Sequence, residues 1–280
     1  MFGGAGRGSG HDDAFARGDG QPAFDTSVAH QARIYDYWLG GKDNYAADRK
    51  AAEEAVAAYP GVATGARANR QFLARAVRYL AREAGIRQFL DIGTGIPTAN
   101  NTHEVAQSVA PGSRIVYVDY DPVVLIHARA LLSSHDDGLI DYLDADLRDP
   151  QPILEQAARI LDFSRPVAIM LIAILHAIDD HDDPYQIVAK LINAMPQGSY
   201  LVLSHGASDI DAEQMAEVAK RINRQSRQQF TPRSHAQVMR FFDGLEVLEP
   251  GVVRVEAWRP VSELDGRNRS AIWGGVAVKR

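Results

Sequence analysis

The chain has 280 residues, of which 46% are hydrophobic, with a formal net charge of −6 and a pI of about 5.8. This is enough apolar sequence for one large domain with an extension, and the acidic balance argues against duplex DNA or a membrane surface as a partner. The absence of cysteine excludes disulfides and thiolate chemistry, and no apolar run reaches the ~18 residues of a membrane span, so we expect a cytoplasmic protein.

Residues 1–24 are rich in glycine and polar side chains and contain no apolar signal core. This composition is typical of a disordered tail. His11 and Asp12 lie in this tail, where we expect them to be solvated rather than to bind a metal.

Residues 25–84 are predicted to form a helical extension. Ile34, Tyr37 and Trp38 fall at helical spacing, and Gly40 with Gly41 should end that helix. Asp43 or Asn44 can cap a second helix that runs from Tyr45 to Ala58. A third, amphipathic helix is expected from Ala66 to Ala84.

Two interpretations of this extension remain open. It can be a helical hairpin that simply packs on the main domain, or it can be a lid that closes over a ligand and excludes water. In the second case it would supply polar contacts to that ligand, from Arg33, Tyr35, Lys42, Asn44 and, at the mouth of the site, Arg70.

The segment from Arg87 to Thr98 predicts a buried strand, a tight loop and a helix that Pro97 can open. Gly93 and Gly95 allow a sharp turn and a ligand lying against the backbone. A dinucleotide fingerprint would need a third glycine where Thr98 stands. The Asp-x-Gly-x-Gly run instead resembles the first motif of S-adenosylmethionine (SAM) dependent methyltransferases, although other nucleotides or an ordinary turn remain alternatives.

From this strand onward, strand and helix patterns alternate across residues 85–280, the predicted main domain. Such alternation indicates a mainly parallel sheet with helices on both faces. The further strands are expected at 114–119, 140–146, 166–174, 199–204, 245–247 and 273–278, and the helices at 122–132, 151–161, 184–194, 211–223 and 234–242.

Acidic residues stand at the ends of the first three predicted strands, counting the strand within the Arg87–Thr98 segment as the first. Asp91 and Asp119 end the first two, and Asp144 and Asp146 end the third. A carboxylate at the second strand can accept hydrogen bonds from a ribose, and an acid beside a backbone N–H can pair with adenine. Such acids can also be merely solvated. Because an acidic pocket repels polyphosphate and no phosphate-binding loop is present, the set favours an adenosine attached to a cationic sulfonium.

His176 follows the fourth strand on the expected ligand side. It is either structural or functional, as a general base or as a wall of the methyl path. Tyr35 is a second candidate base. The acids that follow His176 can bind a divalent metal, but adjacent loop acids are more often solvated, and we predict no metal.

Long strings of the chain resemble an actinobacterial family of SAM-dependent methyltransferase-like proteins long catalogued as a domain of unknown function. They span roughly residues 28–280, nearly all of the predicted folded chain. The strings are RIYDYWLGGKDNYAADR, ANRQFLARAVRYL, GIRQFLDIGTGIPT, NTHEV, IVYVD, DADLRDP, RPVAIMLIAILHAI, GSYLVLSH, LEPGVV and WRP.

The resemblance implies a class I methyltransferase fold, Rossmann-like, with a seven-stranded mostly parallel sheet whose last strand is antiparallel. It implies SAM over Gly93 and Gly95, and ligand contacts from neighbouring residues. Asp91 and Thr94 would hold the methionine end, Asp119 the ribose, and Asp146 with Leu147 the adenine. Tyr120 and Ile174 would also contact the cofactor.

The predicted activity is methyl transfer from SAM to an unidentified acceptor. The Asp/Asn-Pro-Pro-Tyr/Phe motif of N-methyltransferases is absent, and Ile174-Leu175-His176-Ala177 stands in its place. This favours a small-molecule acceptor over a nucleic-acid base. The alternative is a non-catalytic module that binds or senses SAM or S-adenosylhomocysteine (SAH), and a nicotinamide dehydrogenase is a more distant rival.

Overall fold

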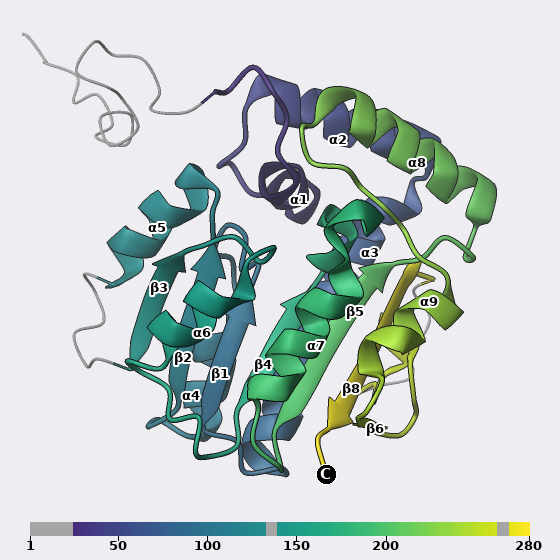
Figure 1. The fold of residues 1–280 in the computed structure, drawn as a ribbon. Coiled ribbons are helices and arrows are strands. Elements are labelled where there is room, and N and C mark those ends of the chain that lie inside the picture. Colours follow the sequence, from purple (N-terminus) through teal and green to yellow (C-terminus); the bar gives the residue numbers. More distant parts are fainter. Residues whose placement is uncertain (1–24, 133–138, 262–268) are drawn as a thin grey trace, which may run out of the picture.

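The computed structural model describes residues 25–132, 139–261 and 269–280. The predicted tail, residues 1–24, lies outside this range. Strands and helices alternate along the chain, with three helices before the first strand (Figure 1). The strands are β1 (Gln88–Ile92), β2 (Arg114–Asp119), β3 (Ile140–Asp144), β4 (Ala168–Ile172), β5 (Tyr200–Gly206), β6 (Glu246–Val247), β7 (Val253–Arg254) and β8 (Ile272–Val278).

The helices cover both faces of the sheet and its upper edge (Figure 1). Short 3-10 turns add to them, of which Leu175–Ala177 and Asp180–Asp182 follow β4. The helices are α1 (Gln31–Leu39), α2 (Ala46–Ala58), α3 (Gly61–Arg82), α4 (Thr102–Val109), α5 (Pro122–Leu132), α6 (Pro150–Ala157), α7 (Pro184–Ala194), α8 (Ala212–Gln225) and α9 (His235–Met239).

The sheet order is β3-β2-β1-β4-β5-β8-β6, with β7 also paired to β8. Strands β1 to β5 are parallel, and β8 runs antiparallel to β5. The antiparallel last strand is as predicted, but the described sheet has eight strands rather than seven, because Val253 and Arg254 pair with β8. After β1 the chain adds β2 and then β3 on one side of β1, and it then crosses back to add β4 on the opposite side of β1. This reversal opens a crevice at the carboxyl ends of β1 and β4, where such sheets bind ligands.

Alternate residues of the strands enter two separate cores. Leu90 and Ile92 pack with the α6 and α7 side, whereas Phe89 packs with α3 and α4. The strand side chains on both faces of the sheet are apolar because helices cover a parallel sheet on both sides. Helix α3, which the sequence analysis assigned to the extension, therefore lies on one face of the sheet, with Phe72 and Leu80 fully buried.

Three predicted helix starts are wrong. Helix α3 begins at Gly61 rather than at Ala66, with Pro60 in the N-cap position. Pro97 lies in the loop, and α4 begins later because Asn101 and Glu104 form a capping box, in which Glu104 accepts the Asn101 N–H at 2.8 Å. Neither Asp43 nor Asn44 caps α2. Tyr45 occupies the cap position, and Asp48 accepts its N–H at 2.8 Å.

No helix within the described ranges is long and apolar enough to cross a membrane.

Candidate functional site

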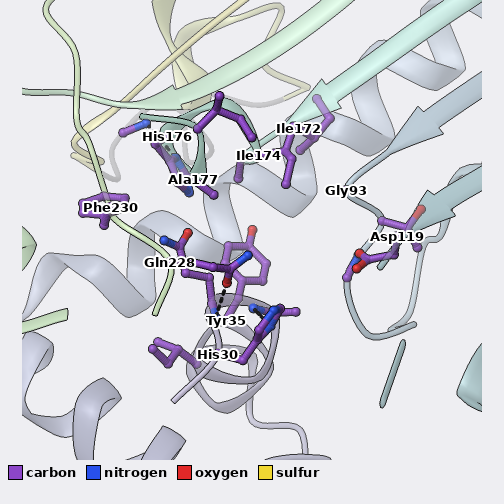
Figure 2. A pocket seen from close by; sticks show the side chains of 18 of the residues that line it. His30, Tyr35, Gly93, Asp119, Ile172, Ile174, His176, Ala177, Gln228 and Phe230 are labelled. Atoms are coloured by element: carbon purple, nitrogen blue, oxygen red, sulfur yellow. Dashed lines mark hydrogen bonds between the residues drawn. The ribbon is translucent and has the colours of Figure 1, made fainter. Parts of the chain in front are cut away.

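A cavity of about 520 Å³ lies at the carboxyl ends of β1 to β4. This volume is in the usual range for small-molecule sites. Its floor is the strand ends and their loops, and its other walls come from α1, α3, α8 and the segment 227–230. Figure 2 shows Gly93 and Asp119 on one side of this space and Phe230 on the other, with His176 and Tyr35 between them.

The loop after β1 depends on two glycines for different reasons. Both adopt positive φ, 75° at Gly93 and 66° at Gly95, which side chains other than glycine rarely adopt. A Cβ on Gly93 would lie 2.4 Å from Cγ1 of Ile174, whereas a Cβ on Gly95 would meet nothing within 4 Å. Gly93 therefore permits close packing of β1 on the β4 loop, and Gly95 leaves bare backbone facing open space.

Asp119 links this loop to the end of β2. Its Oδ2 accepts the Gly95 N–H at 2.8 Å, and its Oδ1 accepts the N–H groups of Tyr120 at 2.8 Å and Asp121 at 3.0 Å. Burial raises the pKa of Asp119, although the N–H groups of Asp121 and Gly95 oppose the shift. Each carboxylate oxygen has two lone pairs, so Oδ2 retains acceptor capacity for a hydroxyl in the cavity.

Asp91 and Arg70 place opposite charges in the cavity wall beside the loop that follows β1. Asp91 is buried and accepts the hydroxyl of Thr102 at 2.6 Å. Arg70 donates through one nitrogen to the carbonyls of Ala99 and Asn100, both at 3.2 Å. Its buried Nε finds no hydrogen-bond partner among the described residues. A buried donor of this kind suits a ligand carboxylate.

Burial raises the pKa of Asp91 to about 6, against hydrogen bonding from Thr102 and the charge of Arg70, which lower it. A folded-state pKa above the ordinary value of 3.8 means that ionisation opposes folding, increasingly so as pH rises from 4 to 6.

Replacing Asp91 with asparagine should therefore remove a pH-dependent destabilisation. We expect the stability of Asp91→Asn relative to the wild type to increase by about 2–3 kcal/mol between pH 4 and pH 8. Denaturant unfolding at both pH values measures this difference, and comparing the two cancels pH-independent effects of the amide. Asp144→Asn, at an exposed position, is the control. A relative stability that did not change with pH would contradict the raised pKa.

Asp146 and Leu147 both line the cavity beyond β3. The Asp146 carboxylate is already engaged by Arg148, whose Nε lies 3.0 Å from Oδ1 and 2.9 Å from Oδ2. Burial alone would raise the pKa of Asp146, but the hydrogen bonds and charge of Arg148 outweigh burial and lower it. Asp144 is exposed and lies outside the cavity wall.

His176 lines the cavity, but its geometry makes it a hydrogen-bond donor rather than the predicted base. Its Nδ1 accepts the Gly206 N–H at 3.3 Å. Burial, with the nearby charge of Arg233, lowers the pKa of His176 to about 3, so the ring is neutral. A neutral imidazole that accepts at Nδ1 carries its proton on Nε2, which it can only donate.

Tyr35 is likewise a wall residue with a satisfied hydroxyl. It donates to the carbonyl of Ala66 at 3.0 Å and accepts from Nδ2 of Asn69 at 3.0 Å. Burial raises the pKa of Tyr35, which disfavours the phenolate that a general base would need. Tyr35 is therefore unsuited to act as a general base.

Three residues predicted to contact the ligand lie outside the cavity wall. Lys42 is exposed. Asn44 is buried against the end of α1, where its Nδ2 donates to Asp36 at 2.8 Å. Arg33 is buried between Asp48 and Asp121, at 3.6 and 3.5 Å. The polar side chains of Arg33 and Asn44 thus hold the extension together instead of facing a ligand.

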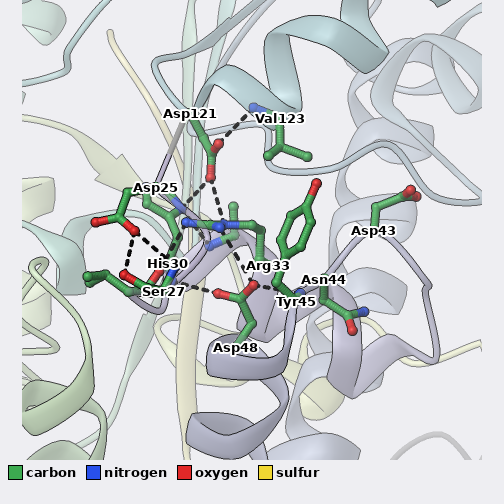
Figure 3. Close-up of polar contacts among 12 residues, drawn as sticks. Asp25, Ser27, His30, Arg33, Asp43, Asn44, Tyr45, Asp48, Asp121 and Val123 are labelled. Carbon is green, nitrogen blue, oxygen red and sulfur yellow. Dashed lines mark hydrogen bonds and ion pairs between the residues drawn. The ribbon is translucent and has the colours of Figure 1, made fainter. Parts of the chain in front are cut away.

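Figure 3 shows the polar cluster that fastens α1 and α2 to the end of β2. His30 lies 2.6 Å from Asp121 through Nδ1, and its backbone N–H donates to Asp48 at 2.9 Å. Burial would raise the pKa of Asp121, but the hydrogen bond and charge of His30 outweigh it and lower that pKa. Because Asp121 is only two residues after Asp119, which ends β2, this cluster fixes the extension relative to Asp119.

Three prominent wall residues were not predicted from the sequence. His30 lines the cavity beside Tyr120, with ring centroids 5.9 Å apart. Gln228 donates to the Tyr120 hydroxyl and accepts the N–H of Gln31 at 3.2 Å. Phe230 packs on His176, with ring centroids 4.7 Å apart. No local pattern marks Gln228 or Phe230, because they follow a surface helix far along the chain.

Within the described residues, no group of three or more His, Asp or Glu side chains is arranged to hold a metal ion. The acids after His176 are occupied instead, since Asp179 and Asp182 pair with His181 at 2.9 and 3.4 Å.

The strand order, the antiparallel last strand and a glycine loop facing strand-end carboxylates define a class I methyltransferase fold. The family model described as S-adenosyl methyltransferase matches residues 17–280. The chain therefore belongs to this family, and its cofactor is SAM.

Solved structures agree with this assignment. A DUF574 family protein from Streptomyces avermitilis is 45% identical, with a TM-score of 0.87 over 91% of this chain and 99% of that one. A candidate methyltransferase from Thermobifida fusca is 42% identical, with a TM-score of 0.85 over 91% and 97%. An O-methyltransferase family protein from Burkholderia thailandensis, 16% identical with a TM-score of 0.51 over 78% and 59%, shares the fold alone. No curated protein matches the chain.

Proposed function

We propose that the protein transfers the methyl group of SAM to a small-molecule acceptor bound in the same cavity. The observation that carries this proposal is that a single cavity joins the glycine loop and carboxylates of the sheet to a wall made by the helical extension. A ligand at the strand ends would thus have neighbouring space for a second molecule. An enclosed wall of helices also suits a small acceptor better than a polymer.

The residues present fit SAM. Asp119 would accept from the ribose hydroxyls, and the bare backbone at Gly95 would allow close approach. Asp91 and the unpartnered Nε of Arg70 would hold the ammonium and carboxylate of the methionine end. Leu147 would cover the adenine, and Asp146 would reach it only by sharing its carboxylate with Arg148.

Bound SAM supplies a methyl group on a positively charged sulfur, which an acceptor lone pair displaces as the C–S bond breaks and its electron pair stays on sulfur. The chain's contribution is to position the acceptor and to exclude water. Tyr35 and Phe230 line the space beside the strand ends, and His176 can donate a hydrogen bond through Nε2.

The alternative, a module that binds SAM or SAH without turnover, has no observation in its favour. We also propose a cytoplasmic location, which a cysteine-free chain suits.

Titration calorimetry tests the cofactor assignment. We expect SAM and SAH to bind the full chain and NAD to show no comparable heat, because a dinucleotide would place phosphates beside Asp91 and Asp119. Tighter binding of NAD would contradict the proposal. Turnover is then tested with methyl-labelled SAM and a panel of small acceptors. SAM binding with no transfer to any acceptor would favour the binding module.

A further inference from the structure

We infer that the acceptor is an uncharged, largely apolar molecule, held between the helical extension and the segment that follows α8. This inference rests on the proposed function, since it concerns the part of the cavity that SAM would leave for the second substrate.

The wall of the cavity away from the strand ends is built mainly from apolar side chains. They come from four separate parts of the chain: α1, α3, α8 with the segment after it, and the start of β8. Among them are Trp38 from α1, Val62 from α3, Met215 and Ile222 from α8, Phe230, and Ile272 from β8. Apolar ligand surface buried against such a wall contributes roughly 25 cal/mol per Å².

The charged groups of the cavity are concentrated at the other end. Arg70, Asp91 and Asp119 stand on or against the loops of β1 and β2, and the pair of Asp146 with Arg148 follows β3. Asp182, in the turn after β4, lies close enough to Arg148 for its negative charge to help raise the pKa of Arg148.

Two charged side chains of the remaining wall are already engaged. Asp36, on α1, is buried, and its Oδ2 accepts from Nδ2 of Asn44 at 2.8 Å and from the Asp43 N–H at 3.0 Å. Arg227 lies at the rim, with a side chain that is 78% exposed and 3.2 Å from Asp25. An anionic acceptor would lose its hydration in this part of the cavity without gaining a cationic partner, and a cationic one would have to compete with the Asn44 and Asp43 donors for the buried Asp36 carboxylate.

Neutral polar groups at the same place can still recognise an oxygen. His176 presents Nε2–H, since its Nδ1 accepts from Gly206. Its ring contacts Phe230 nearly edge-on, with ring planes at 68°, so a donor and an aromatic face lie side by side. This combination suits a carbonyl or hydroxyl group on a ring-containing compound.

Three probes of nearly equal size and different charge test the inference on the full chain saturated with SAH. They are 2-acetylnaphthalene, which is neutral, 2-naphthoate, which is anionic, and 1-(2-naphthyl)ethylammonium, which is cationic. In equilibrium dialysis we expect the neutral ketone to bind at least about tenfold more tightly than either ion, because only the ions give up strong hydration that this largely apolar wall does not replace. Equal or tighter binding of an ion, or no binding of the ketone, would overturn the inference.

A pair of variants locates the probe. Phe230→Ala should weaken binding of the ketone at least about fivefold, through lost apolar contact, with SAH affinity unchanged. Phe163→Ala removes a half-buried phenylalanine that packs on the core and is not in the cavity wall, and it should leave both affinities unchanged. Unchanged ketone binding in a folded Phe230→Ala would place the probe elsewhere and overturn the inference. SAH affinity is measured separately by calorimetry, so that failure to bind SAH refutes the proposed function rather than the class of acceptor.

Discussion

Replacing Arg233 with methionine is expected to lower the free energy of unfolding by about 3–5 kcal/mol, because it leaves two buried carbonyls and a nitrogen of His205 without donors. The Arg233 side chain is 1% exposed and lies between β5 and the turns that follow β4. It donates to the carbonyls of Leu175 and Ile178, both at 2.9 Å, and to Nε2 of His205 at 2.9 Å. It also pairs with Asp180 at 2.6 Å. Methionine fills a similar volume but leaves those acceptors without donors.

The same substitution should weaken SAH binding, because the turns that Arg233 holds carry His176 and Asp179 into the cavity wall. Denaturant unfolding measures the stability, and calorimetry measures the affinity. Arg240→Met is the matched control, since Arg240 is exposed and lies over the Tyr185 ring at 4.0 Å, a contact worth about 1 kcal/mol or less. A loss of stability at Arg233 no larger than at Arg240 would refute the role given to this network.

Replacing Asp119 with alanine is expected to weaken SAM binding by about 1–3 kcal/mol, roughly 5- to 150-fold. The carboxylate would accept from the ribose, and it also holds the N–H of Gly95 at 2.8 Å, which fixes the glycine loop. Both contributions are lost in the variant. Calorimetric titration of SAM into the wild type and the variant gives the difference in affinity.

Two further variants separate the contributions. Asp119→Asn keeps the side-chain volume and one acceptor oxygen, so its affinity should fall between those of the wild type and Asp119→Ala. Asp144→Ala removes the exposed acid at the end of the adjacent strand, outside the cavity, and should bind SAM as the wild type does. Wild-type affinity in a folded Asp119→Ala would exclude Asp119 from the ribose site.

Most of the architecture could be predicted from local patterns. The alternation of apolar strands with amphipathic helices gave the parallel sheet, and the acids that follow three of those strands meet at one edge because parallel strands end together. Asp91, Asp119 and Asp146 do line one cavity with Gly93 and Gly95. The starts of α2 and α4 were misplaced because several residues in each loop can cap a helix, and the capping box that forms depends on the loop's final path.

The extension shows where such patterns fail. Arg33, Lys42 and Asn44 are polar residues in a segment dense with aromatics, and their composition suited a ligand as well as it suited internal packing. In the folded chain, Arg33 and Asn44 are buried against acids of the extension and of the β2 loop. Tyr35, two residues from Arg33, does line the cavity.

The sequence by itself therefore determined the class of fold, the glycine loop and the edge of the sheet at which the carboxylates gather, because each follows from residues close together in the chain. Only the tertiary structure decided which polar groups face the cavity and in what state. The Gly206 N–H sets the tautomer of His176, Arg148 pairs with the Asp146 carboxylate, and Gln228 donates a hydrogen bond to the Tyr120 hydroxyl. The partners of His176 and Tyr120 lie far from them in sequence, so what each polar group can do is defined only once the chain has brought these segments together.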